Sequence, residues 1–155
     1  TVSQLSSRLG WDYFRALKKK GTVAAGGNSS VLQRLDTGEA EVGILLLENV
    51  LTGKKRGSHI ELVIPSDGVV LIPGQIALLP HARRSPAAQA VYDALLTDDA
   101  QRVIVDVGVM HSPDPLQPPP PGVPSLDELL AGQPAPKGTE PPETVKATFD
   151  TIFFR

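Results

Sequence analysis

Residues 26–49 read GGNSSVLQRLDTGEAEVGILLLEN, and this stretch carries the clearest local signals in the chain. Two glycines precede Asn28, and asparagine and serine commonly cap the start of a helix. Gly38 suits a left-handed helix end. Three apolar residues in between share one helical face: Val31, Leu32 and Leu35. The apolar run EVGILLL is typical of a strand covered on both faces, so the stretch predicts a helix followed by a buried strand.

Outward from this stretch, helix and strand patterns alternate. Helical spacing predicts helices at 9–21, from Pro86 onward after a Ser85 cap, at 97–108 and at 143–155. Apolar runs predict strands at 22–26, 41–47, 60–65 and 69–80. This alternation predicts an α/β fold with a mixed sheet flanked by helices over residues 1–112.

Proline is concentrated late in the chain. Eleven of the 15 prolines lie in residues 113–142, where they favour extended polyproline backbone. Ser125 followed by Glu128 forms a capping box, which predicts a short helix near 125–131. We expect residues 113–142 to form a strap across the lobe, and residues 143–155 to form an amphipathic helix that packs on it.

Composition excludes several classes of protein. Fifteen Lys and Arg against 17 Asp and Glu give a net charge of −2, which argues against a nucleic-acid partner. No apolar run approaches the roughly 20 residues that a membrane-spanning helix needs. The chain has no cysteine, so it has no disulfide, thiolate metal site or cysteine nucleophile.

The GGNSS motif offers binding chemistry as well as capping. The amides of a first helical turn, with the Asn28 amide and the Ser29 and Ser30 hydroxyls, can form an anion-binding concavity. The motif lacks the Lys-Ser/Thr end of a phosphate-binding loop, and plain capping without a ligand is the alternative. Glu48 and Asn49 follow the predicted buried strand, where open sheets place ligands, although either could instead cap a helix.

The residues give weaker support to two other kinds of site. A serine hydrolase would use Ser29 or Ser30 with Asp67 and a histidine, but no G-x-S-x-G motif is present. The histidines His59, His81 and His111 lack a metal-ligand spacing. Three basic runs could attract an anion, or could simply be solvated: residues 18–20, 54–56 and 83–84.

Several segments occur in the order seen in the C-terminal half of bacterial periplasmic solute-binding proteins. They are GWDYFRAL, GNSSVLQRLDTGEAEVGI, PSDG, IALLPHARRSPAAQAVYDALLTDDAQ and PSLDEL. The chain resembles the ferric-iron, phosphonate and sugar-phosphate receptors of ABC importers. The resemblance implies one lobe of a type II flytrap fold in the periplasm, or on an extracytoplasmic lipoprotein. It implies no catalysis and no cofactor, and it implies a membrane permease or a sensor protein as partner.

The resemblance also implies where the ligand lies. Gly27, Asn28 and Ser29, with the adjacent Ser30, match the helix-start loop that holds an anionic ligand. Glu48 and Asn49 stand where ferric-binding members carry two tyrosines. Because neither is tyrosine here, a phosphorylated or carboxylated solute fits better than ferric iron with an anion, and no metal ligand is predicted.

Relatives of this kind begin with most of one lobe, and we expect that lobe to be absent here. The apolar surface that it would cover is then expected to meet the missing lobe or a second copy of the chain. The alternative function is a periplasmic sensor or regulatory module that acts through protein contacts. The proline-rich segment and the phenylalanine-rich terminal helix suggest it, because both suit docking.

Overall fold

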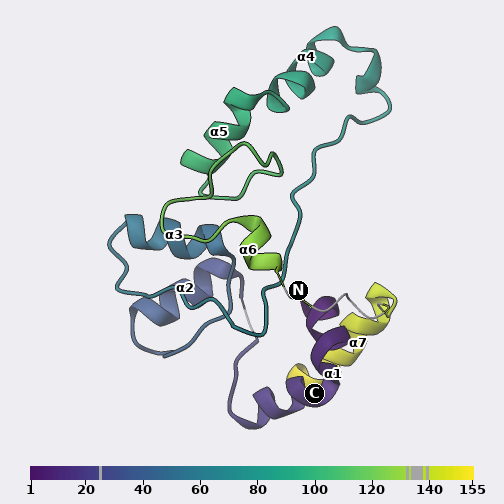
Figure 1. Ribbon diagram of the computed structural model, residues 1–155. Coiled ribbons are helices and arrows are strands. Elements are labelled where there is room, and N and C mark those ends of the chain that lie inside the picture. Colours follow the sequence, from purple (N-terminus) through teal and green to yellow (C-terminus); the bar gives the residue numbers. More distant parts are fainter. Residues whose placement is uncertain (25, 132, 134–137, 139) are drawn as a thin grey trace. The chain divides into compact units, whose positions relative to one another are not determined.

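The computed structural model describes residues 1–24, 26–131, 133, 138 and 140–155 (Figure 1). Its helices are α1 (Val2–Lys19), α2 (Asn28–Asp36), α3 (Leu47–Lys55), α4 (Pro86–Leu95), α5 (Asp98–Asp106), α6 (Leu126–Leu130) and α7 (Pro142–Phe154), with a 3₁₀ turn, η1 (Ala82–Arg84). The chain forms two compact units. The first contains residues 1–27, 64–72 and 132–155, and the second contains residues 28–63 and 73–131.

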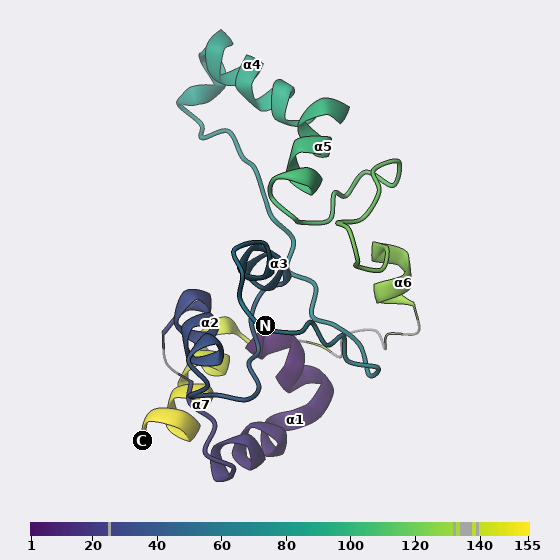
Figure 2. The same ribbon diagram turned by 90° about the vertical axis from the view of Figure 1, so that its left-hand side faces the viewer.

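In the first unit, α1 and α7 pack side by side (Figures 1 and 2). Phe14 is 4% exposed, and its ring meets the ring of Phe149 edge-on with centroids 5.9 Å apart. Phe149 in turn stacks on the buried Phe153 at 4.6 Å. Aromatic pairs in such geometries stabilise a core beyond the area that they bury. An aromatic cluster therefore holds the two helices together.

Helix α1 has a break at Gly10, and the half before the break contacts a segment that is distant in the sequence. Gly10 has φ 74° and ψ 170°, a conformation that glycine adopts without the steric strain of a Cβ. Before the break, Gln4 donates to the Leu71 carbonyl at 2.9 Å, and Arg8 donates to the carbonyls of Val69 at 3.1 Å and Asp67. Residues 67–71 are therefore held by two side chains that stand one helical turn apart.

In the second unit, α2 packs on α3 and α4 packs on α5. Its buried apolar side chains are Val50, Val105, Val109, Pro120 and Val123. The segment after α5 is drawn in by a buried polar side chain, because Gln101 donates to the Leu95 carbonyl at 3.0 Å and accepts from the Ser112 hydroxyl at 2.7 Å. Turns at residues 115–116 and 121–122 interrupt the extended polyproline backbone that the sequence favours. The predicted division of the chain into a lobe (1–112), a proline-rich strap (113–142) and a terminal helix (143–155) stays a prediction.

Three helix starts predicted from local sequence are confirmed, whereas the helix predicted at 9–21 begins earlier, at Val2. The Ser85 hydroxyl accepts from the Ala88 amide, and Pro86 begins α4. The Thr97 hydroxyl accepts from the Ala100 amide before the acidic first turn of α5. Ser125 and Glu128 form the reciprocal capping box at α6. These contacts span three residues, so they depend little on the rest of the fold.

The capping box should make α6 sensitive to acid. Hydrogen bonds from Ser125 lower the pKa of Glu128 from its ordinary value. Because the folded pKa is the lower one, this stabilisation is complete above the unfolded pKa and is lost as pH falls through the folded pKa. Amide NMR shifts of residues 125–130 should report fraying of α6 at acid pH. In Glu128→Gln, which keeps an acceptor, that pH dependence should vanish; an unchanged titration would contradict the assignment.

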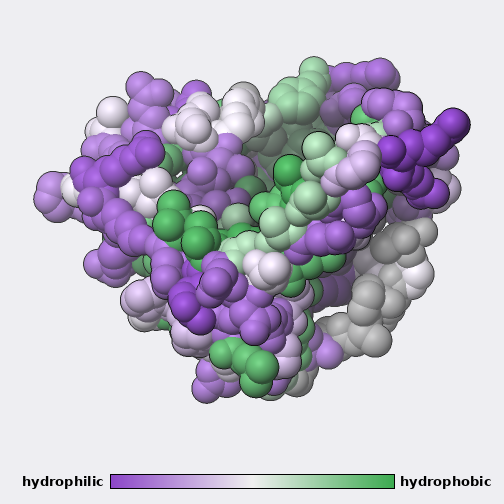
Figure 3. Space-filling view, turned by 90° about the horizontal axis from the view of Figure 1, so that it is seen from above, coloured by the Kyte–Doolittle hydropathy of each residue, from purple (hydrophilic) through white to green (hydrophobic). Residues whose placement is uncertain are grey.

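The predicted mixed sheet, and with it the α/β fold class, is wrong: the residues that the structure describes form helices and no strand. The segments expected as strands leave Val42 85%, Ile44 62% and Val63 81% exposed, and Figure 3 shows apolar side chains open to solvent among polar ones. Apolar periodicity identifies side chains that favour burial. A strand forms only where a second backbone pairs with it, and local sequence does not supply that pairing.

Candidate functional site

The predicted anion-binding motif lies at the start of α2. Asn28 is the first residue of the helix, Gly26 has a left-handed φ of 77°, and Gly27 is exposed. Ser29 is exposed, whereas Asn28 and Ser30 are half-buried. The motif thus begins a helix, as predicted. Contact of these residues with a ligand stays a prediction.

The structure brings the start of α3 to the start of α2. The Asn28 side-chain oxygen Oδ1 accepts from the backbone amide of Leu46 at 3.3 Å, and Leu46 is the N-cap residue of α3. Glu48 and Asn49 are half-buried in the first turn of α3, instead of following a strand as predicted. Asn28 and the N-cap residue of α3, 18 positions apart, therefore meet in the second unit, and Glu48 and Asn49 belong to the turn of α3 that follows this cap.

Close packing further along α2 and α3 keeps their starts together. A Cβ atom built on the buried Gly53 would lie 3.1 Å from the Leu32 side chain. Beyond the end of α3, the Ser58 hydroxyl donates to the Asp36 carboxylate at the end of α2, at 3.0 Å. The two helices are thus joined both at their starts and at their ends.

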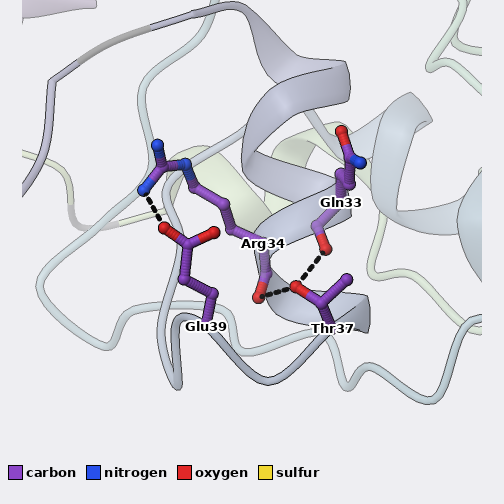
Figure 4. A network of polar contacts seen from close by, with 4 residues as sticks. All are labelled: Gln33, Arg34, Thr37 and Glu39. Atoms are coloured by element: carbon purple, nitrogen blue, oxygen red, sulfur yellow. Dashed lines mark hydrogen bonds and ion pairs between the residues drawn. The ribbon is translucent and has the colours of Figure 1, made fainter.

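The C-terminal end of α2 has its own polar network (Figure 4). The Thr37 hydroxyl donates to the Gln33 carbonyl at 3.0 Å and is within 3.3 Å of the Arg34 carbonyl. Arg34 pairs with Glu39 at 2.6 Å, and Gly38 has φ 73° as expected for a left-handed helix end. Helix α2 is therefore secured at the end opposite to the candidate site.

The chemistry of the site follows from two helix starts and one carboxylate. A helix N-terminus carries partial positive charge, so both starts attract an anion. With Oδ1 committed to Leu46, the Asn28 amide nitrogen Nδ2 is the remaining donor of that side chain, and it has no protein partner among the described residues. Glu48 adds negative charge, which would suit a ligand that also carries a hydroxyl or an amine.

The alternative catalytic and metal residues are not brought into a working arrangement in the described part of the chain. His111 Nε2 is 2.9 Å from the Pro124 carbonyl, and neither Ser29 nor Ser30 is hydrogen-bonded to a histidine there. No group of three or more His, Asp or Glu with metal-binding geometry is found among residues 1–24, 26–131, 133, 138 and 140–155.

Two grooves that the sequence did not predict are lined by other residues. A groove of about 430 Å³ in the second unit is lined by Ile76, Ala77, Leu78, Ala87, Ala88, Val91 and Tyr92. A groove of about 560 Å³ in the first unit is lined by Arg15, Lys18, Lys19, Ala147, Thr148, Thr151 and Ile152. The spacing of Arg15, Lys18 and Lys19 on one helical face was the signal that could have pointed to the groove in the first unit.

Residues 2–109 match the model of a family described as bacterial extracellular solute-binding protein, and this range covers α1 to α5. The chain therefore belongs to the bacterial extracellular solute-binding proteins, a family that is generally non-catalytic and binds solutes outside the cytoplasm. Neither a curated protein nor a solved structure matches the chain. Within the described residues, no helix combines the length and the apolar character needed to cross a membrane.

Proposed function

We propose that this chain binds a small anionic solute at the first turns of α2 and α3, as the receptor component of an ABC importer in the periplasm. The hydrogen bond from the Leu46 amide to Asn28 is the observation that carries the proposal, because it places two helix starts together. Family membership supports solute binding in general. Gly27, Asn28, Ser29 and Ser30 would hold the anionic group, and Glu48 and Asn49 would contact the rest of the solute.

A phosphorylated or carboxylated organic solute fits the site better than ferric iron. Ferric binding through phenolates needs tyrosine, and the chain has only Tyr13 and Tyr92. Tyr13 packs edge-on against Phe14 at 5.3 Å, and Tyr92 lines the apolar groove on α4. Neither tyrosine belongs to the first turns of α2 and α3. A membrane permease is the partner that would receive the solute.

A negative charge introduced at Asn28 provides the sharpest test. Asn28→Asp keeps an oxygen that can accept from the Leu46 amide, but it replaces the Nδ2 donor by a negative charge. Combined with Ser29→Ala, it should weaken binding of the anionic solute at least tenfold, about 1.4 kcal/mol or more, without unfolding the chain. Calorimetry with phosphate, phosphonates, sugar phosphates and dicarboxylates, first on the unaltered chain, provides the measurement.

Glu48→Gln is the matched control, since it removes a negative charge from the same place. Anion affinity should hold or rise in this variant. The site assignment would be refuted if the Asn28→Asp, Ser29→Ala variant bound the anion as tightly as the unaltered chain. An unaltered chain that binds none of these anions would refute the proposed solute class.

A further inference from the structure

The groove between α1 and α7 combines a cationic rim with an apolar wall. Arg15, Lys18 and Lys19 come from α1, and no carboxylate is among its lining residues. From α7 come Ala147 and the half-buried Ile152, with the hydroxyls of Thr148 and Thr151. The volume of about 560 Å³ is within the range of small-molecule sites, roughly 300–1,000 Å³.

The three cations differ in what they already do. Lys18 donates to the Phe153 carbonyl at 2.9 Å, and its ammonium is 5.8 Å from the centre of the Phe153 ring. It therefore caps a carbonyl at the C-terminal end of α7. Arg15 pairs with Asp12 at 2.8 Å, but the Asp12 side chain is 97% exposed and solvent screens such a pair strongly. Lys19 has no side-chain hydrogen bond or ion pair in the part of the chain that the structure describes.

Arg15 and Lys19 stand four residues apart, which places them one turn apart on the same face of α1. One carboxylate or phosphate can therefore meet both side chains. Lys18 and Lys19 both lie in the last turn of α1, where cations suit the helix dipole, and the Lys18 ammonium also reaches a terminal carbonyl of α7. Arg15 lies outside that last turn. The rim of the groove therefore presents the guanidinium of Arg15 and the ammonium of Lys19, which a negative group from outside the chain could meet.

We propose that this groove binds a free anionic amphiphile, with a carboxylate or phosphate head and an alkyl tail. Arg15 and Lys19 hold the head. The tail lies along Ala147 and Ile152 and the aliphatic parts of the lysines, which bury apolar stems readily. Thr151 already donates its hydroxyl proton to the Ala147 carbonyl at 2.8 Å, so the Thr148 hydroxyl is the donor left for the ligand.

Decanoate, titrated by calorimetry and followed by amide NMR shifts of α1 and α7, is the test ligand. Arg15→Gln with Lys19→Gln should weaken its binding on the order of tenfold. Lys146→Gln removes a charge from α7 outside the groove and should leave affinity unchanged. Hexanoate should bind on the order of tenfold more weakly than decanoate, because it lacks four methylenes that the groove would bury.

Three outcomes would overturn the proposal: no binding of decanoate, equal binding of decyltrimethylammonium, or equal loss in Lys146→Gln. The first of these outcomes, together with capture on phosphatidylglycerol vesicles, would point to a membrane surface instead. The proposal is independent of the site at α2 and α3. Decanoate affinity measured from the amide shifts of α1 and α7 should be unchanged in the Asn28→Asp, Ser29→Ala variant, so the failure of either proposal can be recognised separately.

Discussion

Replacing Phe14 by alanine is expected to lower the free energy of unfolding of the first unit by about 3–5 kcal/mol. The Phe14 side chain is 4% exposed, and its ring contacts those of Trp11, Tyr13 and Phe149 at centroid distances of 5.3–5.9 Å. Truncation removes the apolar contacts and leaves a cavity that helices α1 and α7 can close only in part. Urea unfolding followed by fluorescence measures the loss, because Trp11 is the single tryptophan.

Phe154→Ala is the control for this prediction. Phe154 is 60% exposed, although its ring is 6.3 Å from that of Phe149. Its truncation should cost less than about 1 kcal/mol, since most of the ring stays in water in the folded state. Equal losses for the two variants would show that Phe14 is not the central contact between α1 and α7.

Replacing Gln101 by alanine is expected to destabilise the second unit by about 2–3 kcal/mol. The residue is 8% exposed, and its amide joins the Leu95 carbonyl to the Ser112 hydroxyl. The Ser112 oxygen also accepts from the Asp114 amide at 3.0 Å, so the network holds the chain after α5 as it turns back. Removal of Gln101 leaves a cavity, deprives the Leu95 carbonyl of this donor and deprives the Ser112 hydroxyl proton of its acceptor.

A double-mutant cycle separates the network from simple loss of volume. Gln101→Ala, Ser112→Ala and the double variant should show a coupling energy of about 0.5 kcal/mol or more, because one hydrogen bond is shared. Arg102→Ala, next to Gln101 but 62% exposed at its side chain, should change stability by less than about 0.5 kcal/mol. Additive losses for Gln101 and Ser112 would contradict the proposed network.

Part of the candidate site was predictable because it depends on neighbours in sequence. The GGNSS motif predicted the start of α2, and a helix does begin at Asn28. The partner of Asn28 was not predictable, since Leu46 lies 18 residues away in the sequence. Helix α3 itself was missed, because the apolar run before Glu48 was interpreted as a strand that continues to the site.

The sequence by itself determined the left-handed glycine after α2, Gly38, and the N-cap residues of α4, α5 and α6, which are Ser85, Thr97 and Ser125. It also determined the absence of cysteine chemistry. Only the tertiary structure decided that the apolar segments form no sheet within the described residues, that α2 and α3 start together, and that α1 and α7 enclose a cationic groove. The reason is the range of the interactions. A cap or a turn is complete within a few residues, whereas strand pairing and helix packing need partners whose positions local sequence does not specify.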